Sequence, residues 1–163
     1  MRQADEMSRC VRILVVDDYL PWSEFITNTL KKQSGWEVIG KVSDGPEAVQ
    51  QAAQLRPDLI LLDIGLPSLN GIEAAARIRE CSPTSKILFV SENRSIDIVE
   101  KALSTGEGYV IKSDAASELL PAIKAVLEGR RFISARLASH FLVATTLTAQ
   151  TLSWILMLLA GIR

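Results

Sequence analysis

The segment Val11-Arg-Ile-Leu-Val-Val-Asp17-Asp18 is a short apolar run, rich in β-branched residues, that ends directly in two acids. Such a run predicts a buried β-strand. A second apolar run, Leu59-Ile-Leu-Leu, ends in Asp63. Runs of this kind are typical of parallel strands that are covered on both faces. Three further runs complete a set of five predicted strands, at residues 36–42, 86–90 and 108–111.

Amphipathic segments with helical spacing alternate with these runs, which predicts an α/β fold with a doubly wound, five-stranded parallel sheet. The fourth helix is expected over residues 95–104. Pro121 predicts that the fifth helix starts late, with Ser117 as its N-cap, or kinks early. The expected buried faces are Phe25, Ile26, Thr29 and Leu30; Ala48, Val49, Ala52 and Leu55; Ile72, Ala75, Ala76 and Arg79; and Leu119, Leu120, Ile123, Val126 and Leu127.

Composition places the chain among ordinary globular proteins, since 48% of its 163 residues are hydrophobic and 23% are charged. Residues 1–128 hold fourteen basic and nineteen acidic residues, a net charge of −5, which argues against a nucleic-acid surface there.

Cys10 and Cys81 lack metal-ligand spacing and are interpreted as reduced thiols. Residues 1–9 are polar and no secretory apolar run follows them, so we expect a cytoplasmic protein.

Polar side chains follow four of the predicted strands. Asp17 and Asp18 come after the first strand, Asp63 after the third, Ser91 after the fourth and Lys112 after the fifth. Ligands of doubly wound sheets bind outside the carboxyl ends of the strands, so these side chains are expected to share a pocket. Three carboxylates repel one another unless a cation is present, and Mg²⁺ prefers oxygen ligands that include phosphate. The sequence therefore predicts a magnesium site that receives a phosphoryl group.

This order of residues resembles the receiver domain of two-component response regulators, which has a flavodoxin-like (βα)5 fold of the chemotaxis-Y type. The resemblance covers residues 11–129, and the phrase around Lys112 is most similar to the subfamily whose receivers normally precede a helix-turn-helix output domain. The matching phrases are Ile13-Leu-Val-Val-Asp-Asp, Leu61-Leu-Asp-Ile-Gly-Leu-Pro, Asn70-Gly-Ile-Glu-Ala-Ala, Gly108-Tyr-Val-Ile-Lys-Ser and Ile133-Ser-Ala-Arg-Leu-Ala.

The resemblance implies a role for each site residue. Asp63 would be the nucleophile that accepts a phosphoryl group from a histidine kinase, a phosphotransfer protein or a small phosphodonor. Asp18 would bind Mg²⁺ directly and Asp17 directly or through water, with the backbone carbonyl of Gly65 and the carboxylate of Asp63 as further ligands. Lys112 would neutralise the phosphoryl oxygens.

The resemblance also implies a switch made of two residues. Ser91 would donate its hydroxyl to the phosphoryl group, and Tyr109 would rotate inward as Ser91 moves. The chain would then be a signalling module in a phosphorelay, and its only chemistry would be its own phosphorylation and autodephosphorylation. Residues 95–128 would form the face that changes, and we expect homodimerisation through that face.

Two residues depart from the family pattern. Glu92 stands where a small residue is common, and its carboxylate predicts an altered rate of phosphorylation or dephosphorylation. Ser113 stands where many receivers have proline after a cis peptide, which predicts another backbone path after Lys112 because a cis bond before serine costs about 2.5 to 4 kcal/mol.

The C-terminal segment leaves several interpretations open. We divide the chain into a polar extension (1–10), a receiver domain (11–129) and a helical apolar tail (130–163) that fits no complete output domain. Within the tail, residues 141–162 are uncharged and long enough to span a bilayer. The tail is a membrane-contacting or membrane-attaching segment, a helix that packs on the receiver or pairs two copies, or a damaged output region.

Two alternative functions remain beside the phospho-accepting switch. The chain could be a DNA-binding transcriptional regulator with a truncated or atypical output region, since its last 35 residues hold four arginines and no acid. It could also be a phosphohydrolase with an aspartyl nucleophile. Such enzymes usually carry a second acid two residues after the nucleophile, where this chain has Gly65.

Overall fold

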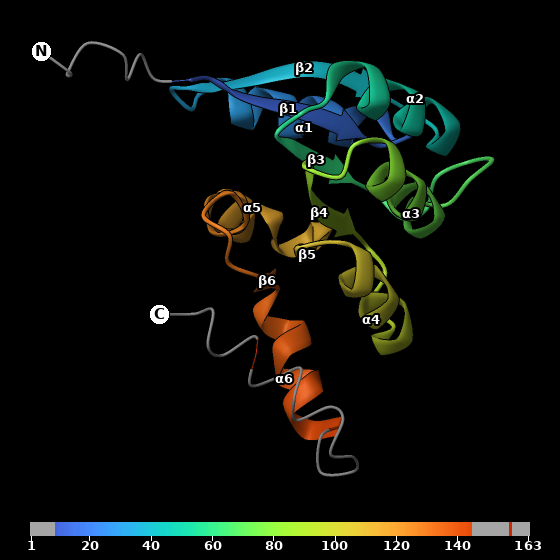
Figure 1. Ribbon diagram of the computed structural model, residues 1–163. Coiled ribbons are helices and arrows are strands. Elements are labelled where there is room, and N and C mark those ends of the chain that lie inside the picture. The colour runs from blue at the N-terminus through green and yellow to red at the C-terminus, as the bar shows by residue number, and fades with distance from the viewer. Residues whose placement is uncertain (1–8, 145–156, 158–163) are drawn as a thin grey trace, which may run out of the picture. The chain divides into compact units, whose positions relative to one another are not determined.

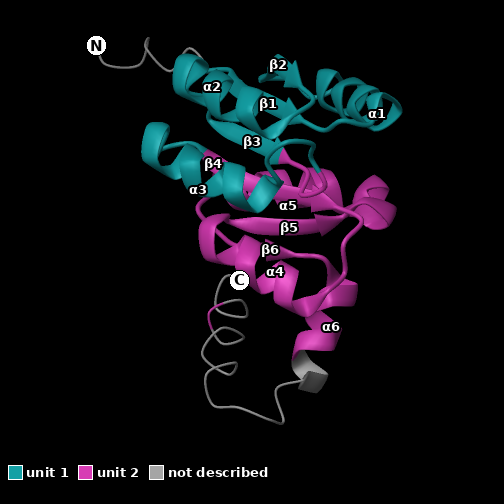
Figure 2. Ribbon diagram, turned by 90° about the vertical axis from the view of Figure 1, so that its right-hand side faces the viewer, with its two compact units in different colours: residues 1–61, 66–85 teal, residues 62–65, 86–163 magenta. Residues whose placement is uncertain are grey.

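The computed structural model describes residues 9–144 and residue 157, drawn from blue to red along the chain in Figure 1. Its residues fall into two compact units, coloured separately in Figure 2. Unit 1 comprises residues up to 61 together with 66–85, and unit 2 comprises residues 62–65 together with those from 86 onward.

Unit 1 contains three parallel strands and three helices, and its strands have the predicted bounds. Its strand order is β2-β1-β3, in which Val11 pairs with Trp36 and Val16 with Val42. The last residue of β3 belongs to unit 2. The elements are β1 (Val11–Val16), α1 (Leu20–Lys31), β2 (Trp36–Val42), α2 (Gly45–Leu55), β3 (Leu59–Leu62) and α3 (Gly71–Cys81).

Two side-chain caps set the helix starts in unit 1. The Asp44 carboxylate accepts a hydrogen bond from the backbone N–H of Glu47 at 2.8 Å, which fixes the first turn of α2. Asn70 caps α3 in the same way, because its side-chain oxygen accepts from the N–H groups of Ile72 and Glu73. Gly45 lies directly against Leu69, the residue before Asn70, so the starts of the two helices are in close contact.

The predicted buried faces of α1 and α3 are partly wrong. Phe25 is 40% exposed and lies beside Trp22, with 5.2 Å between ring centroids, whereas Thr27 is buried. Thr27 tolerates burial because its hydroxyl donates to the Ser23 carbonyl at 2.7 Å. In α3 the buried residues are small apart from one isoleucine, which lets α3 pack closely on α2. They are Gly71, Ala74, Ala75 and Ile78.

Unit 2 adds a strand that the sequence analysis did not predict. Its strand order is β4-β5-β6, and both pairs are parallel, so the described residues contain six strands instead of five. β6 is only two residues long, which is too short for a recognisable period. The elements are β4 (Lys86–Ser91), α4 (Ile96–Thr105), β5 (Gly108–Ile111), the 3-10 helix η1 (Lys112–Asp114), α5 (Ala115–Leu127), β6 (Phe132–Ile133) and α6 (Ala135–Ala144).

The predicted late start of α5 at Ser117 is wrong. The helix begins at Ala115, directly after η1, and the Ser117 hydroxyl donates to the Asp114 carbonyl. Pro121 lies inside the helix, where proline costs about 3 kcal/mol. Burial of the apolar face of α5, which includes Leu119 and Ile123, outweighs this cost.

The backbone after Lys112 forms η1, which contains Ser113. No cis peptide bond occurs among the residues that the structure describes, so the bond between Lys112 and Ser113 is trans.

The described part of the C-terminal segment packs on unit 2. α6 lies against α4 and buries Leu137 and Phe141. Most of the 141–162 segment, for which membrane contact is one of three open interpretations, lies outside the described residues. Among the residues that are described, no helix has the length and apolar character needed to cross a membrane.

Candidate functional site

Four predicted site residues line one cavity in unit 2. Asp63, Gly65, Ser91 and Lys112 come from the segments that follow β3, end β4 and follow β5. The cavity has a volume of about 360 Å³, and its other lining residues are Ile64, Glu92 and Asn93. The structure therefore brings Asp63, Ser91 and Lys112 to one cavity, whereas Asp17 and Asp18, expected in the same pocket, line another cavity.

Asp63 and Lys112 form a buried ion pair in this cavity. Lys112 Nζ donates to Asp63 Oδ2 at 3.0 Å, and each side chain is only 10% exposed. The second carboxylate oxygen of Asp63 accepts a hydrogen bond from the N–H of Ile64 at 2.7 Å. Burying two charges is costly, so a pair held at strand ends beside a cavity marks a functional site more than a stabilising contact.

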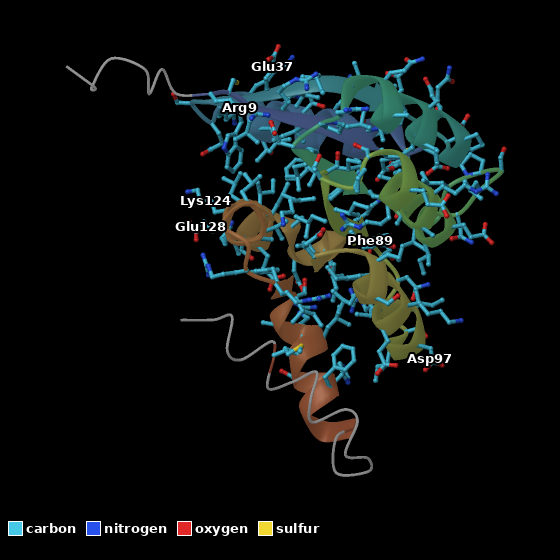
Figure 3. All side chains as sticks on the ribbon, viewed as in Figure 1. Arg9, Glu37, Phe89, Asp97, Lys124 and Glu128 are labelled. Carbon is cyan, nitrogen blue, oxygen red and sulfur yellow. The ribbon has the colours of Figure 1, made fainter. Side chains whose placement is uncertain are left out.

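Ser91 and Tyr109 are connected through Asn93. The N–H of Asn93 donates to Ser91 Oγ at 3.2 Å, and the Tyr109 hydroxyl donates to the Asn93 carbonyl at 2.7 Å. The Tyr109 ring is fully buried and stacks on Phe89, labelled in Figure 3, with 6.3 Å between centroids. The structure thus buries the Tyr109 ring, and its switch role stays a prediction.

Burial raises the pKa of Tyr109 to about 12, a hydrogen bond with Ser91 opposes this shift, and the negative charge of Asp63 adds to it. The folded protein therefore binds the phenolic proton more tightly than the unfolded chain, in which tyrosine has a pKa of about 10.

This shift predicts a loss of stability in alkali. The neutral Tyr109 phenol contributes to the free energy of unfolding. This contribution is fully present below about pH 10 and is lost as the pH rises through about 12. We expect the free energy of unfolding of Tyr109→Phe, measured with urea, to fall less steeply between these two pH values than that of the wild type. Equal slopes for the two proteins would contradict the prediction.

Asp17 and Asp18 lie in unit 1, at the end of β1. Asp17 is 5% exposed and accepts a hydrogen bond from the N–H of Tyr19 at 2.8 Å, whereas Asp18 is exposed. Both line a cavity of about 360 Å³ that also includes Lys41 and Glu47. Among the described residues, Asp17 and Asp18 in unit 1 and Asp63 in unit 2 each offer a carboxylate oxygen as a possible metal ligand. Carboxylate oxygens are the hard donors that Mg²⁺ prefers, so the donor set fits this ion.

The sequence analysis missed two residues beside the unit 2 cavity. Asn93 joins Ser91 to Tyr109, and its side chain also accepts from the N–H of Ser95 at 2.9 Å, just before α4. Arg94 donates to the Ser113 hydroxyl at 3.0 Å and so links the loop after β4 to η1. An asparagine two residues before a helix-capping serine was the signal that could have drawn attention to this loop.

Comparisons with known proteins identify relatives of this chain. The family model described as the response regulator receiver domain matches residues 13–124. The response regulator GacA of Pseudomonas viridiflava is 32% identical over 131 residues, which cover 80% of this chain and 61% of that protein. The transcriptional regulatory protein DegU of Brevibacillus brevis is 30% identical over 133 residues, or 81% of this chain and 56% of that protein.

A solved structure extends the comparison to the fold. The crystal structure of a LuxR-family two-component response regulator from Aurantimonas sp. SI85-9A1 has a TM-score of 0.76 and 32% identity, covering 80% of this chain and 94% of that chain. The present chain spans about three fifths of the length of the two curated relatives. By the family match and this likeness, the chain belongs to the response regulator receiver family and has its flavodoxin-like α/β fold.

Proposed function

We propose that this receiver accepts a phosphoryl group on Asp63 from a histidine kinase or a phosphotransfer protein. The observation that carries the proposal is the buried pair of Asp63 and Lys112, which meet at 3.0 Å beside an open cavity. A carboxylate such as that of Asp63 can act as the nucleophile that accepts a phosphoryl group. The Lys112 ammonium, on a flexible side chain, can neutralise the negative charge of the phosphoryl oxygens.

In the proposed reaction, a carboxylate oxygen of Asp63 attacks the phosphorus of the donor. The bond from phosphorus to the donor atom breaks, the leaving group keeps its electron pair, and an acyl phosphate forms. Lys112 then neutralises phosphoryl oxygens, and the Ser91 hydroxyl donates to one of them. Asp17, Asp18, Asp63 and the carbonyl of Gly65 would hold Mg²⁺, which supplies further neutralisation of charge when bound.

The response would travel through the contacts of Ser91. Movement of Ser91 toward a phosphoryl group acts on Asn93, and Asn93 holds both the Tyr109 hydroxyl and the start of α4. We propose that residues 95–128, which form α4, β5 and α5, are the interaction face that changes and the face through which two copies pair. The phosphoryl group can bias this face only through contacts that differ between its two states.

The test is incubation with acetyl phosphate and Mg²⁺ followed by intact mass measurement. We expect one added phosphoryl group, which is lost in Asp63→Asn and in the presence of a metal chelator. Asp97→Asn is the matched control, because Asp97 is an exposed acid at the start of α4, labelled in Figure 3, and should keep the adduct. An adduct of equal yield in Asp63→Asn would contradict the proposal.

The proposed chemistry is limited to phosphorylation and autodephosphorylation of the chain itself, in the cytoplasm where its kinase would act. Gly65, two residues after the nucleophile, offers no general acid. Turnover of a phosphate ester in many-fold excess over the protein would favour a phosphohydrolase instead.

Glu92 is predicted to slow phosphorylation, because its carboxylate lines the cavity that an anionic phosphodonor must enter. Removing the Glu92 charge near the surface should lower the repulsion of an anionic phosphodonor by about 1 kcal/mol. We therefore expect Glu92→Gln to react with acetyl phosphate about fivefold faster at low ionic strength. High salt should reduce the difference. Glu100→Gln, an exposed α4 variant, is the control. Unchanged rates of formation and hydrolysis in Glu92→Gln would exclude this role.

Transcriptional regulation is a second candidate, favoured by the name of the DegU relative and by the LuxR family of the solved structure. Binding of the full chain to DNA with steep salt dependence would support it. Retention of the same DNA affinity in high salt, or no binding in low salt, would count against it.

A further inference from the structure

Ser134 is a fully buried polar residue between β6 and α6 that the proposed reaction does not use. Its Oγ accepts a hydrogen bond from the N–H of Ile111 at 2.8 Å and donates to the carboxylate of Glu118 in α5. Its own N–H donates to the carbonyl of Tyr109 at 2.9 Å. The hydrogen bond between the Ile111 N–H and Ser134 Oγ is buried, and the loss of a buried hydrogen bond is costly.

These contacts hold the end of β5 that carries the site. Tyr109 is the proposed switch residue, and Ile111 directly precedes Lys112. Ser134 therefore fixes backbone groups on the strand between the switch ring and the ammonium that faces Asp63. The N–H of Ile111 is one peptide away from Lys112, so a backbone movement at Lys112 would reach a group that Ser134 holds.

The same residue starts α6. The Ser134 carbonyl accepts from the N–H groups of Leu137 and Ala138, at 2.9 and 3.0 Å. The Glu118 carboxylate also accepts from the N–H of Ala135 at 3.1 Å, so a negative charge lies at the positive end of this helix. Ser134 and Glu118 thus fix the first turn of α6 and the end of β5 together.

Further contacts hold residues 131–141 against the rest of unit 2. The Arg131 guanidinium donates to the carbonyls of Leu103 and Gly106 at the end of α4, and Arg136 lies 3.4 Å from the carboxylate of Asp114 in η1. Leu137 and Phe141 are buried where α6 packs on α4. Residues 131–141 are therefore fastened to α4, β5 and η1, all of which border the proposed site or its switch.

We propose that Ser134 and Glu118 are positioning residues that couple Asp63 phosphorylation to the docking of residues 132–141, an inference that rests on the function proposed above. A phosphoryl group orders Lys112 and the end of β5, and the docked segment orders the same backbone. Phosphorylation of Asp63 and docking of residues 132–141 each lower the free energy that the other must spend on ordering the end of β5, and such coupling is reciprocal.

The experiment uses the full chain with Mg²⁺ and beryllofluoride, which mimics a phosphoryl group on a carboxylate. Amide hydrogen exchange of residues 132–141 and beryllofluoride affinity are measured on wild type, Ser134→Ala, Glu118→Ala and Ser139→Ala. Ser139 is the matched control, because its hydroxyl donates to the Ala135 carbonyl within α6 and the residue is exposed. Urea unfolding curves are measured first, so that exchange and binding are compared under conditions in which every variant is folded.

Beryllofluoride should slow exchange in residues 132–141 of the wild type and of Ser139→Ala by about fivefold. In Ser134→Ala and Glu118→Ala this ligand-induced change should disappear, and beryllofluoride should bind about fivefold more weakly. A variant that was only structurally weakened would exchange faster but would keep the ligand-induced change.

Two outcomes overturn the proposal in distinguishable ways. Beryllofluoride binding that requires Asp63 but leaves exchange of residues 132–141 unchanged contradicts the coupling and leaves the phospho-accepting function intact. Absence of both beryllofluoride binding and an acetyl phosphate adduct in the wild type contradicts the function, and the coupling fails with it.

Discussion

Lys112→Ala should slow phosphoryl transfer from acetyl phosphate to Asp63 by a factor on the order of 10² to 10³, the usual effect of removing a group that stabilises transferred charge. The ammonium lies 3.0 Å from the acceptor carboxylate in a site where both side chains are 10% exposed, so little solvent screens their interaction. Lys112→Arg should restore only part of the rate, because a planar guanidinium does not replace a compact ammonium.

The rate is measured as growth of the phosphorylated mass peak. Lys124→Ala is the matched control, because Lys124 is an exposed lysine on α5, labelled in Figure 3, and should react at the wild-type rate. Removing one partner of a buried ion pair also destabilises a protein, so circular dichroism must show that Lys112→Ala is folded. A folded Lys112→Ala protein that reacts like the wild type would remove Lys112 from the proposed mechanism.

Gly45→Ala should lower the free energy of unfolding by about 3 kcal/mol, which is at the upper end of the usual cost of overpacking. A Cβ atom at Gly45 would lie 2.6 Å from Leu69 Cβ and closer still to the Leu69 carbonyl oxygen. The contact is with backbone and with the root of a side chain, so it cannot be relieved by a rotamer change. The start of α2 would have to move away from Leu69.

The measurement is the midpoint of urea unfolding, which should fall by about 1 to 2 M. Gly65→Ala is the control, because a Cβ atom there would meet nothing within 4 Å. Equal midpoints for Gly45→Ala and the wild type would show that α2 moves at little cost.

The sequence predicted the strands and most of the unit 2 site for a simple physical reason. Strands covered on both faces need continuous apolar runs, and the residue that ends such a run is placed at the edge where ligands bind. Asp63, Ser91 and Lys112 could therefore be assigned from their positions alone. Gly65 was predicted only through the family resemblance, because it lies in the matching phrase that contains Asp63.

What the sequence did not predict depends on contacts between distant residues. β6 has two residues, and its existence depends on the backbone of β5 beside it. Ser134 could not be selected because serine is common at helix starts, and only the fold brings it to Ile111 and Glu118. The early start of α5 and the burial of Thr27 likewise reflect tertiary packing, which overrides local propensity.

The short strand β6 also limits how much of the edge of β5 is open to pairing with another molecule. An outer strand presents unpaired N–H and C=O groups, which act as a template for a strand of another molecule. In unit 2, β6 pairs with Gly108 and Tyr109, and Ser134 takes up the next backbone groups of β5. A two-residue strand that turns at once into a helix therefore closes the edge of β5 while offering almost no edge of its own.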